Sequence, residues 1–309
     1  MMKGIVVEFL VTEYVLIDLE TKHKIVAKAK GKIKYCDDKD ISLANIINKI
    51  KIGDIVYYET KSNVFLIDSI LPRKNELQRP NISNIDQVFL VFSLVKPRFT
   101  FKLLDKFLLI SQKLKIKVIL IFTKLELITQ EQLNVFKRKI SYYERFYSSY
   151  YLDSKKKYGL EPLYSLFKHK VTILAGQTGV GKSTLLNALT SLNLKTQEIS
   201  LSLNRGKHTT KNSKLYFFYE GYIADTPGFS KLDFSDMSAD KLKDFYHDFL
   251  IFANQCFFGY SCLHIKEKKC KVKEAFQQGL ISNIRYQNYL ILFNEIQKKS
   301  KKFDYKLVI

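Results

Sequence analysis

The spacing of apolar and polar residues divides the chain into three blocks. In residues 1–71, short β-like runs such as GIVVEFL and YVLIDLE are separated by turn residues without a helical period, so we predict a small β-barrel. In residues 72–230, apolar runs such as VFLVFSLV and KVILIFT alternate with amphipathic stretches, which is typical of a parallel α/β sheet with crossover helices. Residues 231–309 have a polar, helical pattern that a Cys and His cluster interrupts. Residues 71–84, basic and Pro-containing, come nearest to a linker.

The second block contains a P-loop, AGQTGVGKST, between the apolar strand VTILA and the helix-like STLLNALTSL. Its glycines let backbone N–H groups turn inward around phosphates at a helix N-terminus. Its lysine reaches the terminal phosphates, and its serine hydroxyl ligates Mg²⁺. We therefore predict that Lys182 also serves catalysis and that Ser183 holds Mg²⁺. The predicted nucleotide-binding residues are Gly176, Gln177, Thr178, Gly179, Val180, Gly181, Lys182, Ser183 and Thr184.

Two segments downstream of the P-loop fit the switches of a nucleotide hydrolase. In ADTPG, Asp225 ends an apolar strand, where its carboxylate can hold Mg²⁺ through water while the Gly228 N–H faces the γ-phosphate. The intervening loop NRGKHTTKNS can close a threonine hydroxyl onto Mg²⁺. We predict Thr210 for this role, with Thr209 as the alternative.

Two segments upstream of the P-loop fit a guanine-reading site. TKLE resembles the [NT]KxD element, in which the stem of Lys124 would cover the base and the carboxylate of Glu126 would accept hydrogen bonds from guanine N1–H and N2–H. Adenine lacks this donor pair. Ser154 and Lys155 follow an apolar strand and resemble the loop whose backbone N–H faces guanine O6. With Thr123, these residues predict GTP and GDP as ligands.

Along the chain, the two segments that would read the base come first, followed by the P-loop, the first switch and the second switch. The base-reading segments usually follow the P-loop, so the order is cyclically shifted. Because the ends of a domain often lie close together, a circularly permuted GTPase domain can keep the same sheet and site. Two other functions stay open: a P-loop small-molecule kinase, and an RNA-binding module with a vestigial nucleotide site.

The third block offers three thiolates and one imidazole in the pattern C-x5-C-x-H-x5-C. This set suits one structural Zn²⁺ in tetrahedral geometry, with no position open for catalysis. The predicted ligands are Cys256, Cys262, His264 and Cys270, and the alternative is that they are buried thiols without a metal. We expect Cys36, in the first block, to be an isolated thiol.

The composition indicates a class of partner. A hydrophobic fraction of 46% argues against general disorder, and 51 Lys and Arg against 30 Asp and Glu give a net charge of +21, which favours a polyanion such as nucleic acid. Enrichment of lysine by an AT-rich genome is the alternative. The apolar runs are shorter than the ~20 residues that span a bilayer, so we expect a cytoplasmic protein. We predict contact with rRNA without identifying the contact residues; Lys28, Lys30, Lys32, Lys34 and Tyr35, which alternate as on one strand face of the barrel, suit RNA, and a merely solvated charged face is the alternative.

The motif order, with LPRKNELQRPNISNIDQ, GQTGVGKSTLLNAL, GKHTT, ADTPGF and CLHIKEKKC, resembles the RsgA family over nearly the whole chain. The resemblance implies an N-terminal OB-fold, a circularly permuted GTPase domain and a C-terminal helical zinc-binding domain. It also implies a protein that binds the small ribosomal subunit and its rRNA, assists late maturation, and is stimulated by the subunit to hydrolyse GTP. We separately expect a monomer.

The sequence departs from the family pattern at several positions. Glu126 replaces the usual Asp, Thr123 replaces the commoner Asn, and five rather than four residues separate the first two cysteines. Lys268 and Lys269 stand where Pro-Gly is usual. Many GTPases orient the attacking water with a Gln after DTPG, but this chain has Phe229 there. The resemblance makes His208 the leading candidate for that task, and a surface histidine without a role is the alternative.

Overall fold

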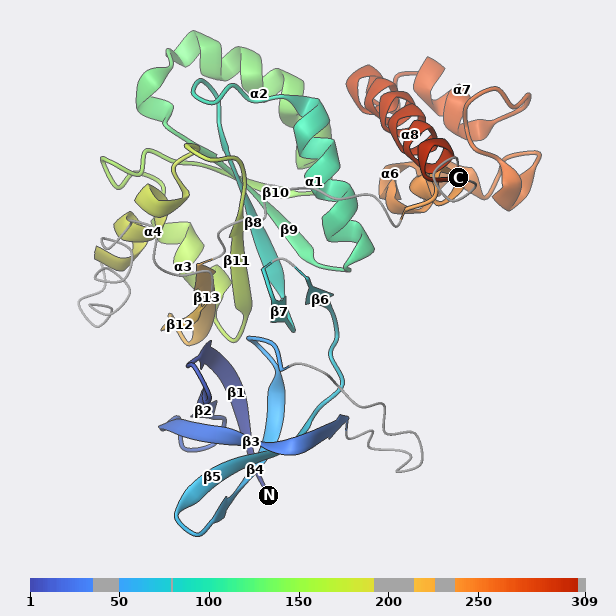
Figure 1. Cartoon of the computed structure of the whole chain (residues 1–309). Coiled ribbons are helices and arrows are strands. Elements are labelled where there is room, and N and C mark those ends of the chain that lie inside the picture. Colours follow the sequence, from blue (N-terminus) through green and yellow to red (C-terminus); the bar gives the residue numbers. More distant parts are fainter. Residues whose placement is uncertain (36–49, 79, 192–213, 226–236, 305–309) are drawn as a thin grey trace. The chain divides into compact units, whose positions relative to one another are not determined.

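The computed structural model describes residues 1–35, 50–78, 80–191, 214–225 and 237–304 (Figure 1). The chain forms two compact units. The first comprises Met1–Pro97, Ile116–Phe136 and Tyr147–Ser230, and the second comprises Arg98–Lys115, Lys137–Phe146 and Lys231–Ile309. Among the described residues, no helix is both long and apolar enough to cross a bilayer.

The first unit begins with a closed five-stranded barrel, which confirms the predicted β-barrel. Its strands close in the order β1-β2-β3-β5-β4, with only β3 and β5 pairing in parallel. Alternate side chains, among them Val6, Leu16 and Ile67, fill the interior, which is the five-stranded arrangement of an OB-fold. The strands are β1 (Met2–Phe9), β2 (Tyr14–Asp18), β3 (Lys24–Tyr35), β4 (Ile55–Lys61) and β5 (Val64–Ile70).

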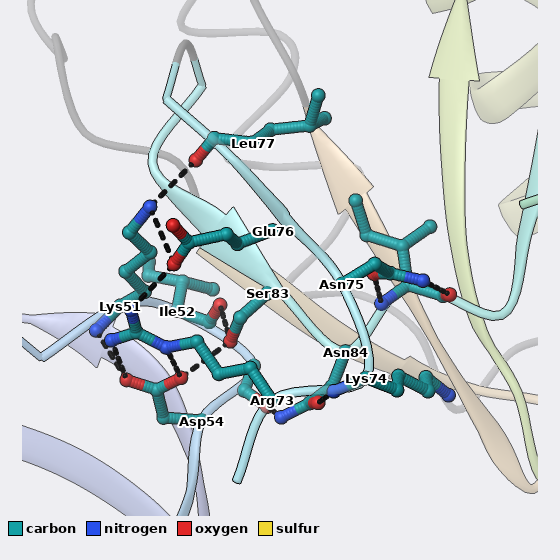
Figure 2. A network of polar contacts seen from close by, with 12 residues as sticks. Lys51, Ile52, Asp54, Arg73, Lys74, Asn75, Glu76, Leu77, Ser83 and Asn84 are labelled. Carbon is teal, nitrogen blue, oxygen red and sulfur yellow. Dashed lines mark hydrogen bonds and ion pairs between the residues drawn. The ribbon is translucent and has the colours of Figure 1, made fainter. Parts of the chain in front are cut away.

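The segment after the barrel is an ordered hairpin rather than a loose linker. Strands β6 (Glu76–Leu77) and β7 (Ile82–Ser83) pair antiparallel. The fully buried Asp54 carboxylate accepts hydrogen bonds from Arg73 Nε at 2.7 Å and from Ser83 Oγ at 2.6 Å, as Figure 2 shows. Because a buried carboxylate needs charged or polar partners, this network fixes the hairpin to the barrel.

A six-stranded sheet forms the rest of the first unit, in the order β10-β9-β8-β11-β13-β12. All neighbours pair in parallel except β12 with β13. Every residue of β8 and β11 is buried, as expected for central strands of a covered parallel sheet. The strands are β8 (Gln87–Ser93), β9 (Lys117–Thr123), β10 (Ser148–Tyr151), β11 (Val171–Ala175), β12 (Lys214–Phe218) and β13 (Gly221–Asp225), accompanied by the helices η1 (Leu125–Leu127), α3 (Glu161–Phe167) and α4 (Lys182–Ser191).

The second unit is helical and has its own apolar core, which includes Phe249, Tyr289 and Leu292. It combines the C-terminal helices with α1 and the end of α2, two helices from the sequence block of the α/β sheet. The buried Arg285 joins these segments, because it contacts Asp105 of α1 and Asp248 of α6. The helices are α1 (Phe101–Lys113), α2 (Gln130–Glu144), η2 (Ala239–Phe245), α6 (His247–Ala253), η3 (Gly259–Ser261), α7 (Lys271–Gln277) and α8 (Asn283–Asp304).

Candidate nucleotide and metal sites

The sheet topology gathers the motifs that are scattered along the chain. Strands β8, β9, β10, β11 and β13 run in parallel, so their carboxyl ends lie at one edge of the sheet (Figure 1). Ligands of open α/β sheets bind outside this edge. Here β9 leads into TKLE, β10 into the Ser154 loop, β11 into the P-loop and β13 into DTPG. In the described part of the chain, the permuted order therefore still brings the strand ends that lead into these motifs to one edge of the sheet.

The P-loop backbone has the geometry of a phosphate cradle. Gly176, Gly179 and Gly181 have φ values of +146°, +83° and +102°, a region that favours glycine. A Cβ atom on Gly176 would lie 2.2 Å from the carbonyl oxygen of Val91, so this position excludes any side chain. The loop then enters α4 at Lys182, which places the loop amides at a helix N-terminus, where anions are stabilised.

The predicted phosphate-contacting side chains lie on this cradle. Lys182 Nζ donates to the carbonyl oxygens of Gly176 at 2.7 Å and Gln177 at 2.8 Å. Its ammonium group therefore lies over the loop, where the phosphates of a nucleotide would lie. Thr178, Ser183 and Thr184 are exposed, whereas Val180 is buried beneath them. The hydroxyl of Ser183 is accordingly free of the protein core and could face a cation.

The first two residues of TKLE pack directly against the P-loop. The buried Thr123 hydroxyl lies 2.5 Å from the Val180 carbonyl oxygen and 3.1 Å from that of Phe92. Lys124, at φ +63°, donates from Nζ to the Gly179 carbonyl oxygen at 2.6 Å. Thr123 can therefore serve in place of Asn as the bridge between the base-reading and phosphate-binding loops.

Two polar atoms in the predicted base pocket have no partner. Glu126 Oε2 and Ser154 Oγ are buried, and neither makes a hydrogen bond to any residue that the structure describes. Lys155 Nζ lies 3.9 Å from Glu126 Oε1, the other carboxylate oxygen. A buried acceptor without a donor is destabilising by about 1–3 kcal/mol. Guanine N1–H and N2–H would satisfy such a carboxylate, so the residues present fit guanine.

The loop that carries Ser154 depends on a residue that the sequence analysis did not single out. The carboxylate of Asp153 accepts hydrogen bonds from the backbone N–H groups of Lys155 and Lys156, both at 3.0 Å. Gly159, at φ +77°, closes the turn, and a Cβ there would lie 2.7 Å from the Tyr151 carbonyl oxygen. An Asp followed within a short polar stretch by Gly is a turn signal that could have identified Asp153.

Several predicted residues lie outside the described part of the chain. They include both candidate switch threonines and the residues after β13. Asp225 closes β13, where its backbone pairs with Lys214, but its side chain is not described. The predictions that fall outside the description are those for His208, Thr209, Thr210, Gly228, Phe229 and Cys36.

The predicted RNA-binding face of the barrel is partly neutralised. Lys30 Nζ lies 2.8 Å from Glu59 Oε1 and 2.5 Å from Asp68 Oδ1, so two carboxylates already balance its charge. Lys28 Nζ lies 3.9 Å from Glu13 Oε1. These ion pairs weaken the case for Lys28 and Lys30 as phosphate contacts, and the side chains of Lys32, Lys34 and Tyr35 are not described.

The four predicted metal ligands come together in the second unit. Their ligand atoms all lie within 4.8 Å of one another, and all four residues are buried. His264 Nδ1 lies 3.4 Å from Cys270 Sγ and 3.7 Å from Cys256 Sγ, and the two sulfur atoms are 3.9 Å apart. A tetrahedron with Zn–S bonds of ~2.3 Å has edges of ~3.8 Å. The cluster therefore has the size and donor set of a structural zinc site.

The electrostatics of this cluster also suit a cation. Burial, with the nearby Lys243 ammonium, lowers the pKa of His264 to about 4, so its imidazole is neutral and can donate a lone pair. Burial raises the pKa of Cys270 to about 12, so the thiol ionises at neutral pH only beside a positive charge. Metal binding therefore has to release protons here.

Polar contacts outside the cluster hold its loops. The carboxylate of Glu267 accepts backbone hydrogen bonds from Leu263 at 2.9 Å and Ile265 at 2.8 Å. Tyr286 donates its hydroxyl to the His264 carbonyl oxygen at 2.7 Å, and Tyr289 donates to that of Leu263 at 2.6 Å. Helix α8 thereby positions the ligand loop, as the outer partners of metal ligands commonly do.

We expect the purified protein to contain about one zinc ion per chain, and Cys262→Ser to lose it. Because zinc binding at a structural site contributes folding free energy, the variant should lower the melting temperature of the helical unit. Elemental analysis and thermal melting would measure both effects, with Cys36→Ser as the matched control. A purified wild-type protein that contains no metal and is nevertheless stable would contradict the prediction.

The comparisons with known proteins agree with this architecture. The family model described as RsgA GTPase matches residues 70–235. The protein named small ribosomal subunit biogenesis GTPase RsgA from Phytoplasma mali (strain AT) is 54% identical over 97% of this chain and 98% of its own length. The protein of the same name from Thermotoga maritima is 37% identical over 97% of this chain and 98% of its own length. These matches do not favour a small-molecule kinase.

Two solved structures share the fold. The crystal structure of YjeQ from Thermotoga maritima superposes with a TM-score of 0.80 at 32% identity, covering 96% of this chain and 98% of that one. The structure of YloQ, described as a circularly permuted GTPase, gives a TM-score of 0.80 at 30% identity, covering 97% of this chain and 96% of that one. From its motifs, its sheet topology and these relatives, the chain belongs to the RsgA GTPase family.

Proposed function

We propose that this protein hydrolyses GTP during biogenesis of the small ribosomal subunit. The observation that supports the nucleotide assignment is the buried Glu126 Oε2 atom, which has no hydrogen-bond partner among the described residues and follows β9 at the same sheet edge as the P-loop. The names of its relatives, which are small-subunit biogenesis GTPases, support the subunit as partner. The net charge of +21 supports contact with rRNA.

Residues of the P-loop and of the two switch segments would each contribute to phosphoryl transfer. The P-loop amides hold the phosphates, and Lys182 moves from the loop carbonyl oxygens to the terminal phosphates. Ser183, Thr210 and Asp225 are our candidates for holding Mg²⁺, and the Gly228 N–H for facing the γ-phosphate. When bound, Mg²⁺ neutralises the charge that develops on the phosphates. Catalysis then depends mainly on positioning, since phosphoryl transfer offers a protein little covalent chemistry.

His208 is our candidate for orienting the attacking water. Phe229 follows DTPG, and a phenyl ring cannot direct a water molecule by hydrogen bonding. His208 directly precedes the two switch threonines, so a docked switch would bring all three to the γ-phosphate together. We propose that the small subunit supplies this docking, that the protein acts as a monomer, and that it works in the cytoplasm.

GDP should bind more tightly than ADP, and Glu126→Ala should reduce this preference by at least about 100-fold. The reason is that the carboxylate accepts two hydrogen bonds from guanine, each contributing about 1.5–3 kcal/mol because one partner is charged. Glu126→Asp should keep or improve the preference. Calorimetry with both nucleotides measures it, with Glu131→Ala, an exposed carboxylate on α2, as control. If ADP competes equally for the wild-type protein, the TKLE assignment is wrong.

A further inference from the structure

The loop between Cys256 and Cys262 presents three aromatic rings to solvent. Phe257 is 69% exposed, Phe258 48% and Tyr260 77%, although the cysteines at both ends of the loop are buried. Aromatic side chains normally contribute buried area, so three exposed rings within four residues call for a partner. These rings belong to the segment in which this chain has one residue more than its family pattern.

The loop backbone and the Tyr260 ring are held in place by specific contacts. The loop makes a short 3₁₀ turn in which Gly259, at φ +49°, donates to the Cys256 carbonyl oxygen at 2.9 Å. The Tyr260 hydroxyl donates to Asp244 Oδ2 at 2.9 Å, and Lys243 Nζ lies 4.2 Å from the centre of the Tyr260 ring. A partner that stacks on these rings would therefore meet a preorganised surface and lose little entropy in ordering it.

Lys269 borders the rings, and two further exposed lysines precede it closely in the sequence. The Phe257 N–H donates to the Lys269 carbonyl oxygen at 3.3 Å, which ties the aromatic loop to the following ligand loop. Lys269 Nζ lies 5.2 Å from the centre of the Phe257 ring, and Lys266 and Lys268 are also exposed. Glu267, between them, directs its carboxylate to backbone N–H groups. We call this surface the aromatic knuckle, and it consists of Phe257, Phe258, Tyr260, Lys266, Lys268 and Lys269.

We propose that the aromatic knuckle binds unpaired RNA, with bases stacked on its rings and phosphates held by its lysines. Stacking platforms bordered by positive charge are the usual means of binding single strands without sequence preference. Bases in a duplex are already stacked and cannot reach the rings. A protein partner fits less well, because lysine is depleted at protein–protein interfaces. This inference rests on the proposed function and specifies which surface meets the rRNA.

Binding of a labelled 12-nucleotide oligouridylate to the zinc-loaded full chain tests the proposal by fluorescence anisotropy. Phe257→Leu combined with Tyr260→Leu keeps the apolar character but removes two aromatic faces, so we expect binding to weaken about tenfold or more. The matched control is Phe217→Leu, an exposed ring on β12 in the first unit, which should leave binding unchanged. Zinc content and melting temperature show whether the variants are folded.

The absence of tryptophan from the chain allows a second readout. Phe257→Trp introduces a single tryptophan, whose fluorescence can be excited apart from that of the tyrosines, and stacked bases should quench it when oligouridylate is added. A 12-base-pair RNA duplex and inorganic polyphosphate should bind the lysines without quenching. The same substitution at Phe217 should give no quenching with any of the three.

Two results would overturn the proposal. One is equal affinity of the wild-type protein and the double Leu variant for oligouridylate. The other is that this variant binds small subunits more weakly but binds oligouridylate as well as the wild-type protein does. That result would show that the aromatic knuckle contacts a ribosomal protein and not unpaired RNA. Neither result bears on the GTPase, because the variants keep the P-loop and base pocket, and their GTP hydrolysis can be measured separately.

Discussion

Lys182→Ala is expected to lower kcat/KM for GTP by about 100- to 1,000-fold, the usual effect of removing one electrostatic contact to a developing charge. In the structure, Lys182 Nζ is held over the P-loop by the Gly176 and Gln177 carbonyl oxygens, at 2.7 and 2.8 Å. These contacts keep the ammonium where phosphates would arrive. Without it, the P-loop would lose a positive side chain that can offset the negative charge of the transferring phosphoryl group.

Steady-state phosphate release measures this effect, and GDP calorimetry separates binding from turnover. Lys139→Ala is the control, because Lys139 is an exposed lysine on α2 away from the P-loop sequence. Lys182→Arg should recover little activity, since the larger guanidinium cannot replace a compact ammonium at this point. Wild-type turnover by Lys182→Ala would remove the P-loop from the mechanism.

Arg285→Met is expected to destabilise the helical unit by about 3–5 kcal/mol, the range for removing one partner of a buried ion pair. Arg285 is 2% exposed, and its Nε and Nη2 atoms lie 3.1 Å from the Asp248 carboxylate, while Nη1 contacts Asp105. Its guanidinium also lies 4.0 Å from the centre of the Tyr246 ring. The substitution would leave two buried carboxylates without their shared cation.

The destabilisation caused by Arg285→Met should depend on pH. Burial already raises the pKa of Asp105 even though Arg285 opposes the shift. Burial also acts to raise the pKa of Asp248, and there Arg285 reverses the shift. Without Arg285, both pKa values should rise. A carboxyl whose folded-state pKa is raised stabilises the fold when protonated, so the variant should regain stability as the pH falls.

Hydrogen exchange of α6 and α8 measures this stability in the helical unit alone, which matters because a chain with two units need not unfold in one step. Arg138→Met, at an exposed arginine of α2, is the control and should have little effect. Arg285→Lys should be intermediate, since an ammonium lacks the planar fork. Unchanged protection in Arg285→Met would show that the buried charges are not what holds α1, α2 and α8 together.

This assembly of helices is the part of the fold that the sequence could not predict. Asp105 and Arg285 lie 180 positions apart, and nothing in the pattern around either residue distinguishes a buried ion from a surface one. Helices α1 and α2 have the amphipathic pattern of ordinary crossover helices. Their grouping with the C-terminal helices depends on a pairing that only the folded chain reveals.

The barrel and the P-loop backbone, by contrast, could be predicted because local sequence determines them. Period-2 alternation allows only one face of a strand to fill the barrel. The P-loop glycines are required by positive φ values, and Thr123 and Lys124 act through contacts with the loop that the motif itself specifies. Asp153 was missed because its contribution is a turn that holds Ser154, a task that many Asp residues perform without any ligand nearby.

Phosphate release from GTP by the full chain, alone, with purified small subunits and with purified large subunits, tests the proposed function most directly. We expect slow hydrolysis by the protein alone and a rise of about 100-fold with small subunits, the gain that correct positioning of reacting groups can give. Large subunits should not stimulate, and His208→Ala should bind small subunits without being stimulated by them. Equal rates for the wild-type protein in all three conditions would contradict a GTPase that acts on the small subunit.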